Sequence, residues 1–474
     1  MMLDLLLIQP PVADFTNSRI IKKSVYEFQK QPPLGLCYIA SILEKNNFKI
    51  KILDMDIFKM SNIQLLNIIK ALKPRVIGFS SNSITVNLAL KYAILVKEYN
   101  PDIIIIFGGH YATLFPEKLI QYEPIDVVVI GEGEYTTLEL LENFLRKSGK
   151  LEKIRGIIYK TNNKKIIKTL PRPLEKNLDN FPIPATYLIL GDAYKKYYSL
   201  IAKKNPITSI ITSRGCPYNC IFCSKIFNTA RFRSADNIIQ ELEYIKSKYR
   251  ISDIQIMDST FNLNRKKNID LCNQIIKNKT DVQWRAICRP DLVDKELLSR
   301  YKRANCYVLT YGVESGSERI LKFLKKQFTP SHIKRAFTLT DGFNIETHAL
   351  FMIGIPGETS QDILKSIKLA RQISPTYLQI SRCVAVPGTP LYDIAIKYKF
   401  FNHQPFIFQN IVVDGFINLK LPNLDNRNIE RLLLFNYLTS AINPRFLFKF
   451  GRAIIQNPLR FLRNVFSLFS YSFK

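Results

Sequence analysis

The first part of the chain alternates short apolar runs with amphipathic segments. In residues 1 to 150, apolar runs of strand length lie at 3–8, 49–53, 75–80, 102–107 and 126–130. Between and after them, apolar residues recur with helical spacing at 34–46, 62–72, 86–99, 116–122 and 135–146. This alternation predicts an α/β domain with a doubly wound, Rossmann-like parallel sheet, in which ligands bind outside the carboxyl ends of the strands.

A second alternation occupies residues 206 to 400. The expected strands are 208–212, 253–257, 283–287, 308–312, 346–353 and 377–381, and the expected helices are 237–248, 267–277, 295–304, 331–339 and 360–373. Six β/α units are too few for a closed eight-stranded barrel. They predict a partial (β/α)6 barrel of the TIM type, with its chemistry in the loops that follow the strands.

The remaining segments are a connection and a tail. Residues 156–169 have two β-rich runs about an Asn-Asn turn, which indicates a hairpin, and prolines without helical spacing follow. The tail mixes aromatic residues with arginines, so it is either a helical cap on the barrel or a basic amphipathic helix at a membrane. We therefore expect domains at 1–150 and 206–400, a hairpin and linker at 151–205, and a basic helical region at 401–474.

The net charge and the hydropathy of the chain bear on whether it binds nucleic acid or a membrane. The formal net charge is +29, but lysine is spread along the whole chain, as a solvated basic surface would leave it. Nucleic acid is therefore not an expected partner. No apolar run approaches the roughly 18 to 20 residues needed to span a bilayer, so we expect a cytoplasmic protein, with the tail as a candidate for peripheral membrane contact.

Three cysteines, Cys216, Cys220 and Cys223, carry the strongest chemical signal. The Cys-x3-Cys-x2-Cys run offers three thiolates within eight residues, one short of the four that fill a four-iron cluster. A centre with an open coordination position is typical of catalysis. A structural zinc site is disfavoured because the nearest downstream histidine is His332, and a disulfide is disfavoured in a long chain without a signal peptide. We expect the other cysteines to be buried thiols: Cys37, Cys272, Cys288, Cys306 and Cys383.

These cysteines, with Phe222 just before the last of them, resemble the signature of the radical S-adenosylmethionine (SAM) enzymes. The resemblance implies that the three thiolates hold a [4Fe-4S] cluster whose open iron binds SAM. It also implies that an electron from the cluster cleaves SAM to methionine and a 5'-deoxyadenosyl radical. Phe222 is then expected at the cofactor.

The resemblance extends to the ends of later barrel strands. It implies that Asp258, after the second strand, contacts the amino group of SAM. It implies that Glu314 and Ser315, after the fourth, face the ribose or carboxylate, and that Gly354 and Gly357, after the fifth, cradle the adenine.

Simpler interpretations remain open for some of these residues. Asp258 and Glu358 are also suited to helix N-termini, where acids are stabilised by the helix dipole. Arg289 is a candidate for the SAM carboxylate or a substrate, or for a structural salt bridge. Trp284 lies within a strand, where core packing is the better interpretation.

The first domain resembles the cobalamin-binding domain of the B12-binding radical SAM subfamily. The segments that carry this resemblance are 32–40, 108–113 and 131–134, and the last two directly follow expected strands. The Asp-x-His-x-x-Gly motif that supplies a cobalt ligand in many cobalamin proteins is absent, and His110 is either a cobalt contact or a loop histidine bound to backbone. The residues expected at cobalamin are Ser80, Gly108, Gly109, His110, Gly131 and Glu132.

The function implied is a cobalamin-dependent radical SAM methyltransferase acting on an unactivated carbon. Its partners would be a small, apolar substrate and an electron donor such as flavodoxin or ferredoxin. A radical cyclase, oxidase or rearrangement enzyme of the same subfamily is the alternative, and a non-catalytic cobalamin or SAM sensor is an alternative of another class. An RNA methylthiotransferase is disfavoured, because the first domain has only Cys37 where such enzymes carry a second cysteine set.

Overall fold

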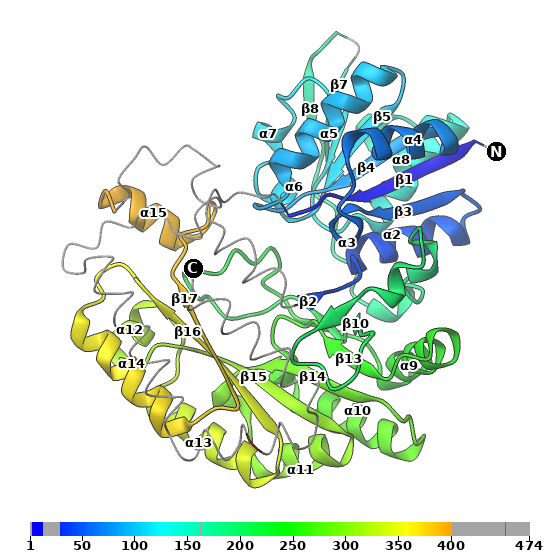
Figure 1. Cartoon of the computed structure of the whole chain (residues 1–474). Helices are drawn as coiled ribbons and strands as arrows, with labels where there is room; N and C mark the ends of the chain where they lie inside the picture. The colour runs from blue at the N-terminus through cyan, green and yellow to red at the C-terminus, as the bar shows by residue number, and fades with distance from the viewer. Residues whose placement is uncertain (1, 13–28, 162, 401–450, 452–474) are drawn as a thin grey trace. The chain divides into compact units, whose positions relative to one another are not determined.

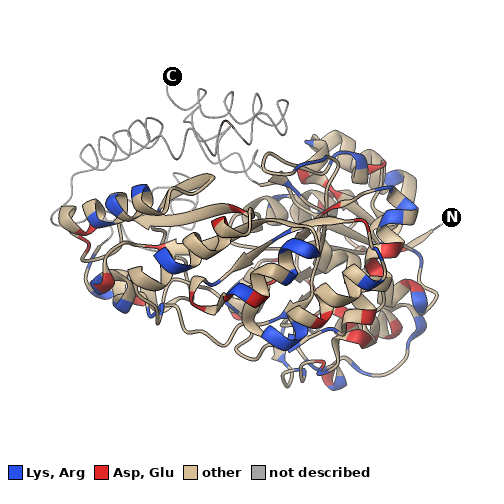
Figure 2. Cartoon of the chain, turned by 90° about the horizontal axis from the view of Figure 1, so that it is seen from below, with Lys and Arg blue, Asp and Glu red and all other residues tan. Residues whose placement is uncertain are grey.

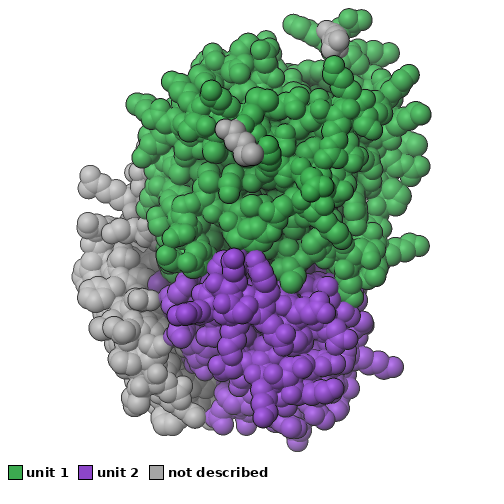
Figure 3. Space-filling model, turned by 90° about the vertical axis from the view of Figure 1, so that its right-hand side faces the viewer, with its two compact units in different colours: residues 1–14, 29–198 green, residues 15–28, 199–474 purple. Residues whose placement is uncertain are grey.

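The chain forms two compact units. The computed structural model describes residues 2–12, 29–161, 163–400 and 451. The described part of the first unit ends at Tyr198, and that of the second begins at Ser199 (Figure 3). The predicted region at 401–474 lies outside the described residues, apart from Gly451.

The first unit is built on a seven-stranded sheet in the order β3-β1-β4-β5-β6-β7-β8. The strands are β1 Leu3–Gln9, β3 Ile50–Asp54, β4 Pro74–Ser80, β5 Ile104–Gly108, β6 Val127–Val129, β7 Ile157–Lys160 and β8 Ile166–Lys168. The first five are parallel, and their order places a topological switch point between β1 and β4. The predicted doubly wound parallel sheet is confirmed.

Helices connect these strands. They are α2 Leu34–Lys45, α3 Met55–Phe58, α4 Asn62–Leu72, α5 Val86–Tyr99, α6 His110–Leu114, α7 Pro116–Leu119 and α8 Glu134–Arg146. Local sequence fixes their starts: Ser61 and Gln64 form a reciprocal capping box at α4, which satisfies two backbone N–H groups. The short α3 and α6 were not predicted, because each is about one turn long and has no readable period.

The segment after α8 packs within the first unit. β7 and β8 pair antiparallel as a hairpin and extend the sheet beside β6. Farther on, the backbone N–H of Ala185 donates to Cys37 O at 3.0 Å, and that of Leu190 donates to Ile52 O at 2.9 Å. The residues between 151 and 198 are therefore part of the first unit, although their composition resembles that of a linker.

The second unit contains six parallel strands in sequential order, β10-β13-β14-β15-β16-β17. They are β10 Thr208–Ile210, β13 Asp253–Ile256, β14 Gln283–Cys288, β15 Cys306–Glu314, β16 Glu346–Ile353 and β17 Tyr377–Arg382. The helices are α9 Ala235–Tyr249, α10 Arg265–Lys277, α11 Lys295–Arg303, α12 Glu318–Phe323, α13 Pro330–Gly342, α14 Ser360–Ile373 and α15 Pro390–Lys397. The strands form an open arc with helices along its outer side (Figure 1), which confirms the partial barrel.

Apolar side chains fill the layer between the barrel strands and their helices. Trp284 packs edge-on against Phe261 and Tyr301, and its Nε1 donates to Ala304 O at 2.7 Å. The interpretation of Trp284 as a core residue is confirmed. All five single cysteines are buried, as expected for thiols that pack as small apolar groups.

Charged side chains are distributed over the described surface. Figure 2 shows lysine and arginine on many helices, interspersed with acidic residues and not gathered into one patch. Among the described residues, no helix is long and apolar enough to cross a membrane.

Candidate active site

The cysteine run lies in the loop after β10, at the carboxyl end of the first barrel strand. The pair of strands β11 Ser213–Arg214 and β12 Arg231–Phe232 closes the base of this loop antiparallel. Between them, Gly215 has φ +89°, and a Cβ at this position would lie 2.2 Å from Thr229 O. Only glycine fits this turn, which directs Cys216 into the loop.

Hydrogen bonds hold the cysteine loop in shape. Lys225 Nζ donates to Cys216 O at 3.1 Å, to Asn219 Oδ1 at 3.0 Å and to Tyr218 O. Ile221 N donates to Leu324 O at 3.3 Å and Ile221 O accepts from Leu391 N at 2.9 Å, so the loop is tied to both α12 and α15. A loop fixed at this many points can present thiolates without large rearrangement.

The three thiols have different surroundings. Cys223 is exposed, whereas Cys216 and Cys220 are half-buried. Burial raises the pKa of Cys220, while the positive charges of Lys326 and Arg289 act to lower it. Burial also raises the pKa of Cys223, and a hydrogen bond from the Lys225 backbone opposes this.

The donor set fits an iron-sulfur cluster. In the described part of the chain, no group of three or more His, Cys, Asp or Glu side chains converges on a single ion. A cubane cluster binds each thiolate at a different iron, so its cysteines do not need to meet at one point. The loop offers three cysteines, cationic neighbours and one partly open side, which suits a cluster with a free iron.

Asp258 anchors this loop. It is buried just after β13, and its carboxylate accepts four hydrogen bonds: Thr212 N at 2.7 Å, Thr212 Oγ1 at 2.5 Å, Ser213 N at 3.0 Å and Ser213 Oγ at 2.7 Å. Burial raises its pKa, and these hydrogen bonds act to lower it. A carboxylate has about four acceptor positions, so the geometry favours a positioning role over the predicted contact with the SAM ammonium.

Glu314 lies at the end of β15 in a left-handed conformation, with φ +65°. Such a conformation is costly for a residue other than glycine and is found where a side chain must be aimed. The strand register slips between Gly312 and Glu314, and Lys326 Nζ donates to Glu314 Oε1 at 3.1 Å. The contact of Glu314 with SAM stays a prediction.

The hydroxyl of Ser315 lies against α14. Its side chain is fully buried, lies 3.2 Å from Ser366 Oγ on α14, and accepts from Ser317 N at 3.1 Å. Its hydroxyl joins α14 to the loop after β15. The contact of Ser315 with the SAM ribose or carboxylate stays a prediction.

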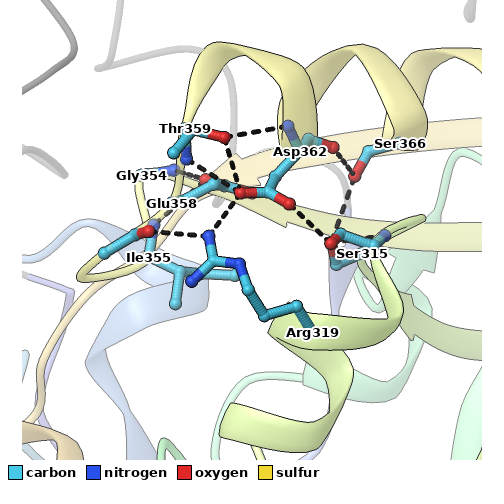
Figure 4. Close-up of polar contacts among 10 residues, drawn as sticks. Ser315, Arg319, Gly354, Ile355, Glu358, Thr359, Asp362 and Ser366 are labelled. Carbon is cyan, nitrogen blue, oxygen red and sulfur yellow. Dashed lines mark hydrogen bonds and ion pairs between the residues drawn. The ribbon is translucent and has the colours of Figure 1, made fainter.

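The glycine-rich loop after β16 is shaped by two acids (Figure 4). Glu358 Oε2 accepts from Gly354 N at 2.7 Å and from Ile355 N at 3.2 Å, so the amide of Gly354 is already used. Gly357 has φ +79° and is exposed, with open space where a Cβ would be. The predicted adenine cradle thus keeps Gly357 available, while Gly354 shapes the turn.

Asp362 on α14 joins this loop to the loop after β15. Its carboxylate accepts from Ser317 Oγ at 2.6 Å, from Thr359 Oγ1 at 2.7 Å and from Arg319. Burial would raise its pKa, but these hydrogen bonds hold the pKa of Asp362 well below its usual value. Arg319 also donates to Gly357 O at 2.8 Å. Asp362 and Arg319 together therefore clamp the loop after β16 to the loop after β15.

Two cations beside the cysteine loop complete the site. Lys326 is buried, with Nζ 5.6 Å from the centre of the Phe222 ring. The guanidinium carbon of Arg289 lies 3.5 Å from the centre of the Tyr218 ring. Arg289 Nη2 also pairs with Asp291 Oδ2 at 2.9 Å, so the structural salt bridge considered for Arg289 is present. Phe222 itself packs on the apolar cluster around Ile221.

The cobalamin residues predicted in the first unit meet at the carboxyl edge of its sheet. Ser81 joins the ends of β4 and β5, because its N–H and its hydroxyl each donate to Gly108 O at 2.8 Å. Gly109 has φ +95°, and a Cβ there would lie 2.7 Å from Ser81 O, so glycine is required. Ser80 ends β4 beside this turn, and His110 begins α6.

The turn after β6 is more open. Gly131 has φ +84° with open space where a Cβ would be, and its N–H donates to Thr113 Oγ1 at 3.0 Å. Glu132 Oε2 accepts from Glu175 N at 3.3 Å. Glycine turns of this kind let backbone approach a bulky ligand, so the residues present fit the predicted cobalamin site. Contact of each with cobalamin stays a prediction.

Comparison with known proteins identifies the family. A model described as the B12 binding domain matches residues 28–141, and one described as the radical SAM superfamily matches residues 210–370. An uncharacterized methyltransferase of Pyrococcus horikoshii is 32% identical over 425 residues, which cover 88% of this chain and 89% of the relative. The chain belongs to the B12-binding radical SAM family.

Other members of this family differ in activity. An anaerobic magnesium-protoporphyrin IX monomethyl ester cyclase of Rubrivivax gelatinosus is 26% identical, with 88% of this chain and 75% of the relative covered. Among solved structures, the cobalamin-dependent SAM radical enzyme OxsB matches with a TM-score of 0.72 and 18% identity over 98% of this chain and 75% of its own. The methyltransferase TsrM from Kitasatospora setae matches with a TM-score of 0.68 and 18% identity over 85% of this chain and 76% of its own. These similarities confirm the predicted two-part fold.

Sequence reasoning missed several residues of the site. Lys326, Lys225 and Thr260 all lie at the cysteine loop, and Thr260 Oγ1 is 3.5 Å from Cys216 Sγ. Lysines are frequent in this chain, so neither one stood out. Lys326 Nζ lies over the rings of Phe222 and Phe328. This position depends on how the segment after α12 packs, which the sequence pattern does not show.

Proposed function

We propose that this chain is a cobalamin-dependent radical SAM methyltransferase that methylates an unactivated carbon of a small molecule. The observation that carries the proposal is the rigid cysteine loop at the carboxyl end of β10, anchored by Asp258 and flanked by Lys326 and Arg289. The same edge of the barrel carries Glu314 and the clamped loop after β16, which are suited to hold a nucleoside-containing cofactor.

The residues of the chain have distinct roles in this proposal. Cys216, Cys220 and Cys223 would hold a [4Fe-4S] cluster, and Lys326 and Arg289 would offset the negative charge of the thiolates. Glu314 would bind SAM from the end of β15, and Gly357 would leave room for the adenine. When bound, the cluster and SAM would supply a radical that removes hydrogen from the substrate, and cobalamin would supply the methyl group.

Electron supply and location belong to the proposal as well. Cys223 is exposed, so an external electron donor such as flavodoxin or ferredoxin would have an approach to the cluster. We place the protein in the cytoplasm, where its free cysteines stay reduced. Peripheral membrane contact through residues 401–474 remains part of the proposal.

Product analysis tests methyl transfer. Anaerobically reconstituted protein, supplied with SAM, hydroxocobalamin and reductant, is expected to form both 5'-deoxyadenosine and S-adenosylhomocysteine. S-adenosylhomocysteine forms because SAM donates a methyl group, whereas a cyclase or rearrangement enzyme needs only the radical. 5'-Deoxyadenosine without S-adenosylhomocysteine would favour the cyclase alternative, which the cyclases among the relatives motivate.

A further inference from the structure

Lys326 is a buried cation beside the cysteine loop. Its side chain is 8% exposed, and its Nζ lies 5.6 Å from the centre of the Phe222 ring and 5.2 Å from that of the Phe328 ring. Phe222 stands between Cys220 and Cys223 in the sequence. Burying an ammonium group is costly, and a buried ion pair is often no more stabilising than apolar side chains of similar size. Stability of the fold is therefore a weak reason for a lysine at this position.

Glu314 is the carboxylate that compensates the charge of Lys326. Lys326 Nζ donates to Glu314 Oε1 at 3.1 Å, and the Glu314 side chain is 10% exposed. Among the described residues, neither side chain forms a second ion pair. The two belong to different elements, since Glu314 ends β15 and Lys326 follows α12. A single contact therefore joins the two buried charges.

Arg289, the second cation near the loop, is compensated differently. Its Nε donates to Asp291 Oδ1 at 3.0 Å and its Nη2 to Asp291 Oδ2 at 2.9 Å, so the two side chains form a bidentate pair. Such a pair has a fixed geometry. The positive charge of Arg289 is thus offset at its own position, by a residue two places along the chain. Lys326 is the better candidate for a charge that acts on the cysteines.

The Cys220 thiol indicates which charges reach the loop. Burial raises its pKa, and the positive charge of Lys326 is the largest opposing influence, followed by that of Arg289. The negative charge of Glu314 acts in the other direction and has a smaller effect than Lys326. A field that stabilises a thiolate at Cys220 also stabilises negative charge added to a cluster bound there.

We infer that Lys326 raises the reduction potential of the [4Fe-4S] cluster, and that Glu314 limits this effect. Reduction transfers one electron from the external donor to the cluster, and a neighbouring positive charge stabilises the reduced form. This inference rests on the proposed function and names the residues that tune the same site. Lys326 acts on the cluster through its charge and takes no part in bond cleavage, so it is not a catalytic residue.

Potentiometric titration of two variants tests the inference. In Lys326→Met the cation is removed and Glu314 stays, so the ratio of reduced to oxidised cluster at a fixed potential should fall about tenfold. For a one-electron couple this is a fall of about 59 mV in the midpoint potential. In Glu314→Gln the cation loses its partner, and the midpoint potential should rise. The electron paramagnetic resonance signal of the reduced cluster measures both, in the reconstituted full chain without SAM.

Opposite shifts distinguish a charge effect from a loss of packing. Poorer packing or entry of water would move the potential in the same direction in both variants. The double variant Lys326→Met/Glu314→Gln removes both charges and should return towards the wild-type potential, and Lys326→Arg should stay near it. Shifts of the same sign, or no shift in either single variant, would overturn the inference. Failure of both single variants to incorporate iron would overturn it too, because the pair would then serve the fold.

Lys322→Met is the matched control. Lys322 is exposed on α12, four residues before Lys326, and its loss changes the net charge of the chain by the same amount. Solvent and salt screen a surface charge, so the midpoint potential should match wild type. An equal fall in Lys322→Met and Lys326→Met would indicate an effect of overall charge and contradict the role of Lys326.

The proposed function is checked separately in the same preparations. If reconstituted wild type holds no reducible cluster, or forms no 5'-deoxyadenosine from SAM and reductant, the proposed function fails. If wild type cleaves SAM and the midpoint potential is independent of Lys326 and Glu314, only the inference fails.

Discussion

Asp258 holds the start of the cysteine loop, a role that its position in the sequence did not predict. Four donors from Thr212 and Ser213 converge on its carboxylate. Asp258→Asn replaces one oxygen by an NH2 group that cannot accept, so at least one buried donor loses its partner at a cost of about 1–3 kcal/mol. We expect iron incorporation to fall strongly, as measured by iron per chain after reconstitution.

Asp281→Asn is the matched control for that variant, because the Asp281 side chain is 86% exposed and its ion pair in the described part of the chain is with Lys246, at 3.3 Å. Iron content should match wild type there. Normal iron content in Asp258→Asn would contradict the anchoring role.

Glu358 makes stability depend on pH. Burial raises its pKa to about 7 from an ordinary value of 4.5, and no partner for its Oε1 is found in the described chain. The folded protein therefore holds this proton more tightly than the unfolded chain. The unfolding free energy falls as pH rises from about 4.5 through about 7, by up to about 3 kcal/mol.

Glu358→Gln cannot ionise and should remove this part of the pH dependence. Urea unfolding at pH 5.5 and at pH 8 checks it, and the single tryptophan, Trp284 on β14, reports on the second unit. The same loss of stability between the two pH values in both proteins would show that Glu358 does not titrate as described.

At the scale of elements, the turn at Gly215 controls the cysteine loop. A Cβ would lie 2.2 Å from Thr229 O, and the left-handed backbone adds about 1–3 kcal/mol for alanine. Gly215→Ala should therefore reduce cluster incorporation and SAM cleavage, as measured by the iron-sulfur absorbance and by 5'-deoxyadenosine. Gly342→Ala, on α13 with open space around it, should behave like wild type. Full cluster incorporation in Gly215→Ala would be inconsistent with this account.

Helices whose apolar residues recur with clear helical spacing were predictable from the sequence. Segments whose position depends on tertiary contacts were not. α4 and α14 match the expected ranges because apolar spacing and capping boxes both mark where they begin. α5 matches by its apolar spacing, without a capping side chain at its start. The proline-rich stretch after Thr169 has no period, and its place in the first unit depends on contacts such as Tyr197 Oη to Asp54 Oδ2 at 2.9 Å.

The sequence indicated where the candidate site lies, but not the role of each of its residues. The cysteine spacing and the strand-end acids located it, since residues after parallel strands gather at one edge of the sheet. The sequence could not distinguish acids that face a ligand from acids that hold a loop. The carboxylates of Asp258 and Glu358 both accept hydrogen bonds from loop backbone, and Ser315 is buried against α14.

At the scale of the whole molecule, the formal net charge is +29, and its basic residues are spread along the whole sequence. Acidic residues separate the basic ones over the described helices (Figure 2). We expect only weak binding to a generic RNA or DNA duplex at about 0.15 M salt, because the Debye length there is about 8 Å. Fluorescence anisotropy at low and physiological salt checks this. Tight binding that persists at physiological salt would point to a nucleic-acid substrate.

The central claim is that the cysteine loop cleaves SAM by electron transfer, and formation of 5'-deoxyadenosine tests it most directly. With reductant and SAM, reconstituted wild type should form 5'-deoxyadenosine. Cys220→Ala should abolish it, and Cys272→Ala, at a buried thiol of α10, should not. Undiminished 5'-deoxyadenosine from Cys220→Ala would contradict the account.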